Sequence, residues 1–339
     1  MKSVVLVVPP APKIVDLKAL GGRWPRLGIA YIAAYLRDRG VRVGILDCKV
    51  EGLNLEKATE RILDFQPDLV GVSAFTEEIL EAATICRLVK NNRKSIATVI
   101  GGAHASAIPE QVLVEFSGID IAVYGEGEET LGELIESGGE DPGNIRGIIF
   151  REGREGIARF TGFRDLAIEL DTLPFPAYEK LDGFPDAYKL PIFNYPRVPN
   201  TSCISSRGCP YSCSYCDRSV FRRSFRHNSA EYLYEHLRHL KERFGTRHVN
   251  LYDDQFTFHR KRVEAFTAMM IDRPLGMTFN CAVRAEHVDP ELLRRMKAAG
   301  CWMVSLGIET GDERLLAQHR QHADLDRIAG TMRMIKRAG

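Results

Sequence analysis

Short runs of β-branched residues alternate with helical stretches along most of this chain, and this alternation restricts the fold more than any other feature. In the first part of the chain, strand-like runs lie at 3–8, 41–47, 69–75, 97–102 and 120–125. A helical pattern follows each run, and strands joined through helices favour a parallel sheet that is covered on both faces. The sequence therefore predicts an α/β protein whose first domain, residues 1–140, is a doubly wound sheet.

The alternation breaks near residue 140 and resumes at residue 201. Residues 146–160 predict a β-hairpin, and the six prolines between 171 and 199 exclude regular helix or strand there. We expect residues 141–200 to form a hairpin and a proline-rich linker that joins two domains.

Four more strand-like runs alternate with helices in the last part of the chain, at 201–206, 248–253, 277–283 and 301–309. A complete barrel of alternating strands and helices has eight such units. Residues 201–339 therefore predict a partial (β/α) barrel. Because the sequence ends where a further strand would follow the last helix, we expect a barrel that is truncated at its C-terminus.

Charge and cysteine content narrow the class of function. The 46 Lys and Arg residues nearly balance the 45 Asp and Glu residues, so no overall field favours nucleic acid or an anionic membrane. The apolar run near the N-terminus is too short for a signal peptide, and no stretch is long enough to span a membrane. We expect a cytoplasmic protein that acts on a small-molecule substrate, with its eight cysteines reduced or bound to metal.

Three of these cysteines, Cys209, Cys213 and Cys216, follow a predicted strand with Cys-x3-Cys-x2-Cys spacing. Three thiolates on a cubane of four irons leave one iron open, whereas electron-transfer clusters usually have four cysteine ligands. A zinc site would need four ligands, usually from two separated Cys-x2-Cys pairs, and the chain has one such pair. The motif therefore predicts a [4Fe-4S] cluster with one open iron.

This spacing, with the aromatic Tyr215 before the last cysteine, resembles the signature of the radical S-adenosylmethionine enzymes. The resemblance implies that the amino and carboxylate groups of S-adenosylmethionine bind the open iron. It also implies that one electron cleaves the sulfonium to give a 5′-deoxyadenosyl radical, with the cofactors doing the difficult chemistry. An electron donor such as flavodoxin or ferredoxin is then a partner.

Polar residues at the carboxyl ends of the later strands are candidates for contacts to S-adenosylmethionine, because barrel active sites gather at those ends. Asp253 and Asp254 would accept hydrogen bonds from the ammonium or the ribose, or else start a loop or cap a helix. Arg284 suits the carboxylate, or else pairs with Glu286 on the surface. Glu309 is the fourth candidate, with capping of the next helix as its alternative.

The doubly wound, Rossmann-like domain in front of such a barrel resembles the cobalamin-binding domain of the cobalamin-type radical enzymes. That group contains carbon methylases and proteins like the anaerobic magnesium-protoporphyrin monomethyl ester cyclase. Glycines at strand ends let the backbone approach a bulky ligand at the edge of a sheet. The candidate cobalamin contacts are Ser73, Gly101, Gly102, His104, Gly125 and Glu126. His104 has a hydrogen bond to the loop backbone as its alternative role.

One segment departs from the methionine-synthase type of cobalamin domain, which uses Asp-x-His-x-x-Gly to place an imidazole under cobalt. Here the segment is Asp47-Cys-Lys-Val-Glu-Gly52, so Lys49 replaces the histidine. An ammonium cannot bind a metal unless it loses a proton, which is costly for an ordinary lysine at pH 7. Bound cobalamin would therefore lack a protein imidazole from this position.

The resemblance implies cobalamin-assisted methyl transfer to an unactivated carbon of a small biosynthetic intermediate. Two alternatives stay open from the sequence. One is an oxidative cyclase of the porphyrin-ester type, and the other is a non-catalytic protein that binds cobalamin or an iron–sulfur cluster.

Overall fold

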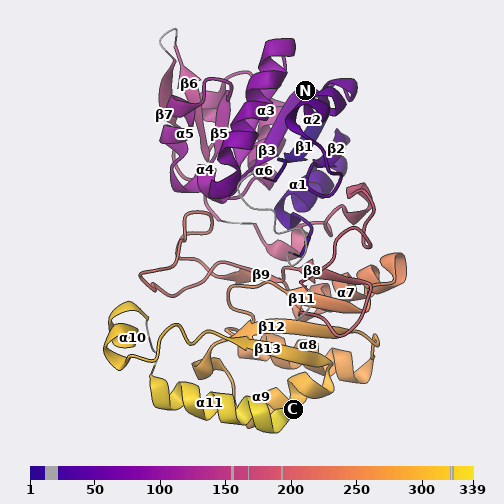
Figure 1. Ribbon diagram of the computed structural model, residues 1–339, viewed down its shortest axis with the longest axis vertical. Helices are drawn as coiled ribbons and strands as arrows, with labels where there is room; N and C mark the ends of the chain where they lie inside the picture. Colours follow the sequence, from indigo (N-terminus) through magenta and orange to yellow (C-terminus); the bar gives the residue numbers. More distant parts are fainter. Residues whose placement is uncertain (12–21, 154–155, 167, 192–193, 321, 323) are drawn as a thin grey trace. The chain divides into compact units, whose positions relative to one another are not determined.

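The computed structural model of the protein (Figure 1) describes residues 1–11, 22–153, 156–166, 168–191, 194–320, 322 and 324–339. The described residues form two compact units. The first unit contains the described residues of 1–11, 25–166 and 173–187, and the second contains those of 22–24, 168–172 and 188–339. Both units are built from alternating strands and helices, which confirms the α/β class.

The first unit is built on a seven-stranded sheet with the order β2-β1-β3-β4-β5-β6-β7. Its strands are β1 (Ser3–Val8), β2 (Arg42–Asp47), β3 (Leu69–Ser73), β4 (Ala97–Gly101), β5 (Ile121–Val123), β6 (Ile148–Glu152) and β7 (Ile157–Phe160). The first five strands pair in parallel. Their order reverses between β1 and β3, and doubly wound sheets bind ligands at the carboxyl ends of the strands beside such a reversal.

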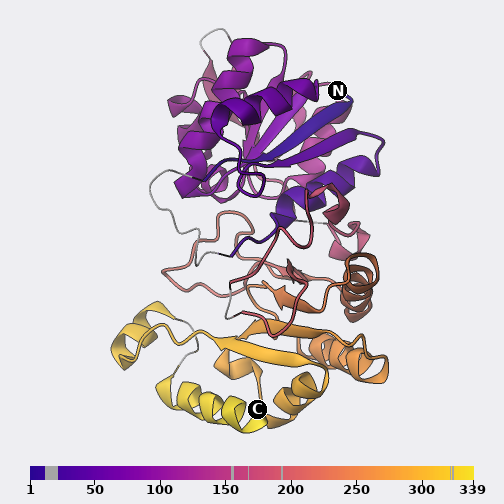
Figure 2. The same cartoon turned by 45° about the vertical axis from the view of Figure 1, so that its right-hand side comes forward.

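Helices cover both faces of this sheet (Figure 2). They are α1 (Leu27–Arg37), α2 (Leu55–Asp64), α3 (Ile79–Asn92), α4 (Ala103–Ala107), α5 (Pro109–Glu115) and α6 (Glu128–Glu136). Strand β1, which lies between β2 and β3, is buried on both sides: Val4 and Leu6 pack in one layer with α1 and α6, whereas Val5 and Val7 pack in the other with α2 and α3. Continuous apolar runs of this kind are typical of parallel strands covered on both faces.

The hairpin of β6 and β7 belongs to this sheet. β6 pairs with β5 in antiparallel fashion, and β7 pairs with β6. We expected a connector between domains, but Ile148 and Ile149 are fully buried in the two opposite apolar layers. A hairpin that is apolar on both faces is more stable inside a covered sheet than in a linker.

The second unit contains a four-stranded parallel sheet with the order β13-β12-β11-β8. Its strands are β8 (Asn200–Cys203), β11 (His248–Leu251), β12 (Thr278–Val283) and β13 (Cys301–Leu306). Its helices are α7 (Ala230–Phe244), α8 (Arg260–Asp272), α9 (Pro290–Ala298), α10 (Glu313–His319) and α11 (Leu325–Ala338). The four carboxyl ends lie at one edge, as in the predicted partial barrel.

Among the helices that the structure describes, none combines the length and the apolar character needed to cross a bilayer.

Candidate functional site

The cysteine loop leaves the second sheet after β8 and is closed at its base by a short ladder. β9 (Ser206–Arg207) pairs with β10 (Arg226–His227), so the two ends of the loop are held side by side. Gly208 turns the chain with φ of 83°, and a Cβ atom there would lie 2.4 Å from the carbonyl oxygen of Ser224. Only glycine fits this turn, which directs the chain toward Cys209.

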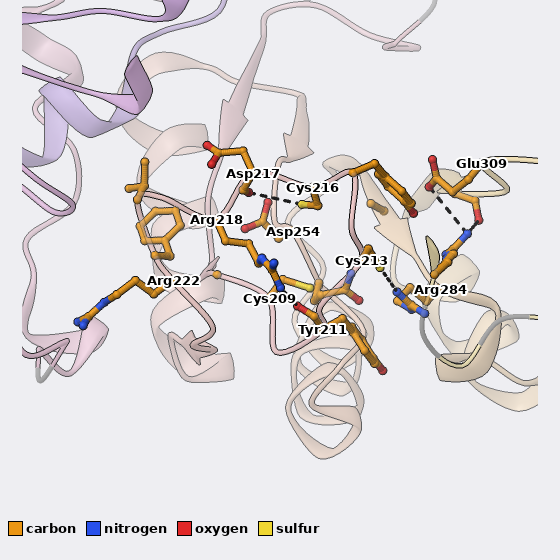
Figure 3. Close-up of a pocket in the computed structure, with 18 of the residues that line it drawn as sticks. Cys209, Tyr211, Cys213, Cys216, Asp217, Arg218, Arg222, Asp254, Arg284 and Glu309 are labelled. Atoms are coloured by element: carbon orange, nitrogen blue, oxygen red, sulfur yellow. Dashed lines mark hydrogen bonds and ion pairs between the residues drawn. The ribbon is translucent and has the colours of Figure 1, made fainter. Parts of the chain in front are cut away.

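The three cysteines of the motif line one pocket of about 410 Å³ (Figure 3). Cys213 is buried, Cys209 is half-buried and Cys216 is exposed. Among the described residues, no group of three His, Cys, Asp or Glu side chains is placed to hold a single metal ion. A cubane places each of its cysteine ligands on a different iron, so thiols spread around a pocket are the donor set that it needs. A structural zinc ion would need four converging donors.

Partial desolvation by the pocket walls raises the pKa of the Cys209 and Cys216 thiols above the ordinary value, and the charge of Asp254 raises the pKa of both thiols further. Metal ligands must be thiolates, so metal binding at this site releases protons.

The two adjacent aspartates after β11 point to different places. The Asp253 carboxylate is buried and accepts hydrogen bonds from the backbone N–H groups of Ser205, at 2.6 Å, and Ser206, at 3.0 Å. Asp254 instead lines the pocket with the cysteines (Figure 3). Partial desolvation by the pocket walls raises the pKa of the Asp254 carboxyl, and the neighbouring Asp253 charge adds to this shift. Only Asp254 therefore faces the space beside the thiols.

Arg284 follows β12 and also lines the pocket. Its guanidinium carbon lies 3.9 Å from the centre of the Tyr211 ring, and its Nη1 atom lies 3.8 Å from the Cys213 sulfur. The predicted pairing with Glu286 also occurs, but Arg284 is buried and Glu286 is half-buried, so the pair does not lie on the open surface. Arg284 therefore brings a positive charge to the wall beside Cys213 (Figure 3).

Glu309 lines the same pocket just after β13 and has a left-handed backbone, with φ of 67°. This conformation is rare outside glycine and is a strain that proteins keep mostly at functional sites. Glu309 does not cap the next helix, because the side chain of Asp312 accepts the capping hydrogen bond of α10. Arg320 at the end of α10 lies 3.8 Å from the Glu309 carboxylate and donates to the carbonyl of Gly307.

Arg320 and His319 are site residues that the sequence did not single out. The backbone N–H of Ser214, inside the cysteine loop, donates to the carbonyl oxygen of His319 at 3.1 Å. The Ser214 hydroxyl also lies 2.7 Å from Nδ1 of His319. The seven-residue helix α10 has no strong periodic pattern, so neither residue had a predicted element to place it.

The candidate cobalamin contacts lie at the carboxyl edge of the first sheet. Ser73 ends β3, Gly101 ends β4, and Gly125 and Glu126 follow β5. Gly102 has φ of 98°, and a Cβ atom there would lie 2.7 Å from the carbonyl oxygen of Ala74. Glycine at position 102 is therefore required by the close approach of the backbone that follows β3.

His104 lies on α4, a short helix that the sequence analysis did not predict. Its Nδ1 atom is 3.2 Å from the hydroxyl of Thr76, so it contacts a side chain of the neighbouring loop. The backbone N–H of Gly125 donates to the hydroxyl of Ser106 at 3.0 Å. These contacts connect the loops after β3, β4 and β5.

Lys49 forms an ion pair with Glu78 of the short helix η1 (Thr76–Glu78). The Glu78 carboxylate is fully buried and also pairs with Arg26. A lysine ammonium has three donors and no lone pair for a metal. The residues of this edge fit a cobalamin that receives no protein nitrogen at position 49.

Two family profiles match the chain: the B12 binding domain over residues 14–135 and the Radical SAM superfamily over residues 203–339. An uncharacterised methyltransferase of Pyrococcus horikoshii is 31% identical over 93% of this chain and 67% of its own length. An anaerobic magnesium-protoporphyrin IX monomethyl ester cyclase of Rubrivivax gelatinosus is 28% identical over 94% of this chain and 58% of its own length. The chain thus spans about six tenths of the length of these relatives.

Two solved structures have the same fold. The cobalamin-dependent S-adenosylmethionine radical enzyme OxsB matches 99% of this chain with a TM-score of 0.85 and 20% identity, over 48% of its own chain. The radical S-adenosylmethionine methyltransferase TsrM of Kitasatospora setae matches 100% of this chain with a TM-score of 0.78 and 18% identity, over 65% of its own chain. The two profiles, the relatives and the fold agree with the arrangement of thiols and glycines described above. The chain therefore belongs to the radical S-adenosylmethionine enzymes that carry an N-terminal B12-binding domain.

Proposed function

We propose that this protein is a cobalamin-assisted methyltransferase that acts on an unactivated carbon of a small molecule. In this proposal Cys209, Cys213 and Cys216 hold a [4Fe-4S] cluster, and the carboxyl edge of the first sheet holds cobalamin. The observation that carries the proposal is one pocket lined by all three thiols of a Cys-x3-Cys-x2-Cys motif. The methyltransferases among its relatives support the type of reaction.

The charged residues of the pocket have complementary roles in this proposal. Asp254 accepts a hydrogen bond from the ammonium of S-adenosylmethionine, and Arg284 binds its carboxylate, because a guanidinium pairs well with carboxylates. Glu309 binds a polar group of the nucleoside. When bound, the cluster and S-adenosylmethionine supply a radical that activates a carbon–hydrogen bond, and cobalamin supplies the methyl group. An external donor, such as flavodoxin or ferredoxin, supplies the electron.

Anaerobic reconstitution with iron and sulfide tests the cluster and its reactivity. We expect protein treated with dithionite and S-adenosylmethionine to release 5′-deoxyadenosine, and Cys213→Ala to abolish this release. Cys281→Ala is the matched control, because Cys281 is buried outside the pocket. A preparation that carries an intact cluster and forms no cleavage product would instead support a non-catalytic binding protein.

An oxidative cyclase is the second candidate, because anaerobic magnesium-protoporphyrin cyclases from three organisms match more than nine tenths of this chain. Methyl transfer from S-adenosylmethionine leaves S-adenosylhomocysteine, whereas oxidative ring closure does not require it. Formation of S-adenosylhomocysteine together with 5′-deoxyadenosine supports the methyltransferase, and 5′-deoxyadenosine alone supports the cyclase.

A further inference from the structure

The base of the cysteine loop is held by a buried network that lies outside the pocket. Asp253, which follows β11, uses one carboxylate oxygen for the backbone N–H groups of Ser205 and Ser206. Its other oxygen accepts a hydrogen bond from the Ser205 hydroxyl. Asp253 is therefore fully engaged with the two residues that begin the loop.

Arg262 of α8 reaches the same place from another element. Its Nη2 atom donates to the carbonyl oxygen of Ser205 at 3.0 Å and also to the Ser205 hydroxyl. Its Nε atom donates to the carbonyl oxygen of Asn228 at 2.8 Å. Since Ser205 precedes β9 and Asn228 follows β10, one guanidinium holds both ends of the cysteine loop. The Ser205 hydroxyl connects Arg262 to Asp253, and we call these three residues the loop anchor.

The loop anchor contains two charged side chains that are buried, and burying a charge costs solvation free energy. Asp253 and Arg262 are each 4% exposed. A charged group that is removed from water loses several kcal/mol of solvation free energy, which is on the order of the attraction that it gains from an opposite charge in the protein. Apolar residues of similar size would serve overall stability as well or better. Apolar side chains, however, cannot form the directional hydrogen bonds that fix backbone N–H and carbonyl groups at both ends of the loop.

The position of the loop anchor connects it to the thiols. Two residues separate Ser206 from Cys209, and one of them is the turn at Gly208, whose backbone N–H interacts with Asp254. Groups behind metal ligands orient those ligands, and their loss typically weakens metal binding by about 10- to 100-fold. We propose that Asp253 and Arg262 are positioning residues that set the placement of Cys209, Cys213 and Cys216, and that Asp253 makes no contact with the cofactors. This inference rests on the proposed function for the identity of the metal.

Two measurements on the full chain test this proposal. The first is the rate of alkylation of each cysteine in metal-free protein, resolved by mass spectrometry. In Asp253→Asn and Ser205→Ala we expect Cys213 to react about tenfold faster or more, because this buried thiol depends on the loop conformation. Cys86 and Cys281, which are buried elsewhere, should keep their slow rates and so report that the fold is intact.

The second measurement is the rate of iron release from reconstituted protein to a chelator, together with the paramagnetic resonance spectrum of the reduced cluster. We expect release about 10- to 100-fold faster in Asp253→Asn, with Arg262→Lys intermediate because lysine keeps the charge but not the planar set of donors. Arg260→Gln is the matched control, since Arg260 lies on the same helix and pairs at the surface with Glu264 and Asp289.

Folded Asp253→Asn and Ser205→Ala proteins with wild-type alkylation and iron release would overturn the proposal. If Asp253→Asn does not fold, Ser205→Ala and Arg262→Lys decide the result by the same two rates. Wild-type protein that takes up no iron would contradict the proposed function alone, because the alkylation rates still measure the placement of the thiols.

Discussion

The role of each residue at this site depends on contacts with distant parts of the chain, which the neighbouring sequence does not show. Asp253 and Asp254 follow the same strand and are chemically identical, so the sequence made both of them cofactor candidates. The structure separates them, because Asp253 finds backbone donors at the start of the cysteine loop whereas Asp254 lines the pocket. That the three motif cysteines lie around one pocket was predictable, because their spacing within one short loop keeps them close together.

Asp254→Asn tests the direct contact that we assign to this carboxylate. Loss of a hydrogen bond to a charged partner costs about 1.5–3 kcal/mol, which is about 10- to 100-fold in affinity. We expect S-adenosylmethionine to bind the reconstituted variant more weakly by this factor, as measured by calorimetric titration, with iron content unchanged. Equal affinities of variant and wild type would remove Asp254 from the binding site.

Lys49→His tests the absence of a protein ligand to cobalt. An imidazole is neutral for most molecules at pH 8 and can bind a metal, unlike the ammonium that it replaces. We expect paramagnetic resonance of bound cob(II)alamin to show nitrogen coupling from the imidazole in this variant. In protein whose histidines carry nitrogen-15, wild type and Lys49→Gln should lack coupling to that isotope, and its appearance in wild type would contradict the interpretation of Lys49.

Long elements with a regular pattern were predictable, and short ones were not. The ranges of β1, β2 and β12 agree with the predicted strand-like runs to within a residue, because each is a run of mostly apolar residues. The five-residue α4 and seven-residue α10 were missed, although they carry His104 and His319. Their stability comes from contacts with distant loops, which local sequence does not contain.

Arg320→Gln tests the connection between α10 and the end of β13. The change removes the hydrogen bond to the Gly307 carbonyl and the charge beside Glu309. We expect a loss of about 1–3 kcal/mol in the free energy of unfolding and weaker binding of S-adenosylmethionine, because Glu309 loses its partner. Arg314→Gln, an exposed change on the same helix, should leave both quantities unchanged. A similar loss in both variants would point to the helix as a whole.

For the whole molecule, the alternation of strands and helices was enough to predict two α/β parts, but not the sheet to which each segment belongs. The hairpin of β6 and β7 joins the first sheet through pairing with β5, a contact between segments about 27 residues apart. Residues 168–172 belong to the second unit, although residues on both sides belong to the first. The placement of the hairpin and that of residues 168–172 both depend on burial in the complete fold. The sequence pattern within one segment does not contain this information.

Stability of the whole fold should depend on pH through His236. Complete burial lowers the pKa of this imidazole from 6.5 to about 3, and its Nδ1 atom lies 3.3 Å from the Cys203 sulfur. Above pH 6.5 the imidazole is neutral in both the folded and the unfolded chain. Below that pH the unfolded chain takes up a proton that the folded chain does not, so the free energy of unfolding falls by about 2 kcal/mol at pH 5.

Urea denaturation of wild type and His236→Gln at pH 7.5 and pH 5 measures this effect. We expect the decrease between the two pH values to be smaller in the variant by about 2 kcal/mol. The variant is also less stable at pH 7.5, because a buried amide replaces the imidazole, but the contribution of the amide itself does not change between the two pH values. Equal decreases would mean that His236 does not remain neutral in the folded protein.

The paired strands β9 and β10 and the glycine turn at Gly208 have a consequence for how the protein is assembled in the cell. The strand pairing and the glycine turn that close the base of the loop are made between protein groups and involve no metal ligand. In classical zinc fingers, by contrast, the chain folds only around its metal. We therefore expect metal-free protein to keep the two ends of the cysteine loop together, so that lost iron can be replaced without passage through the unfolded state.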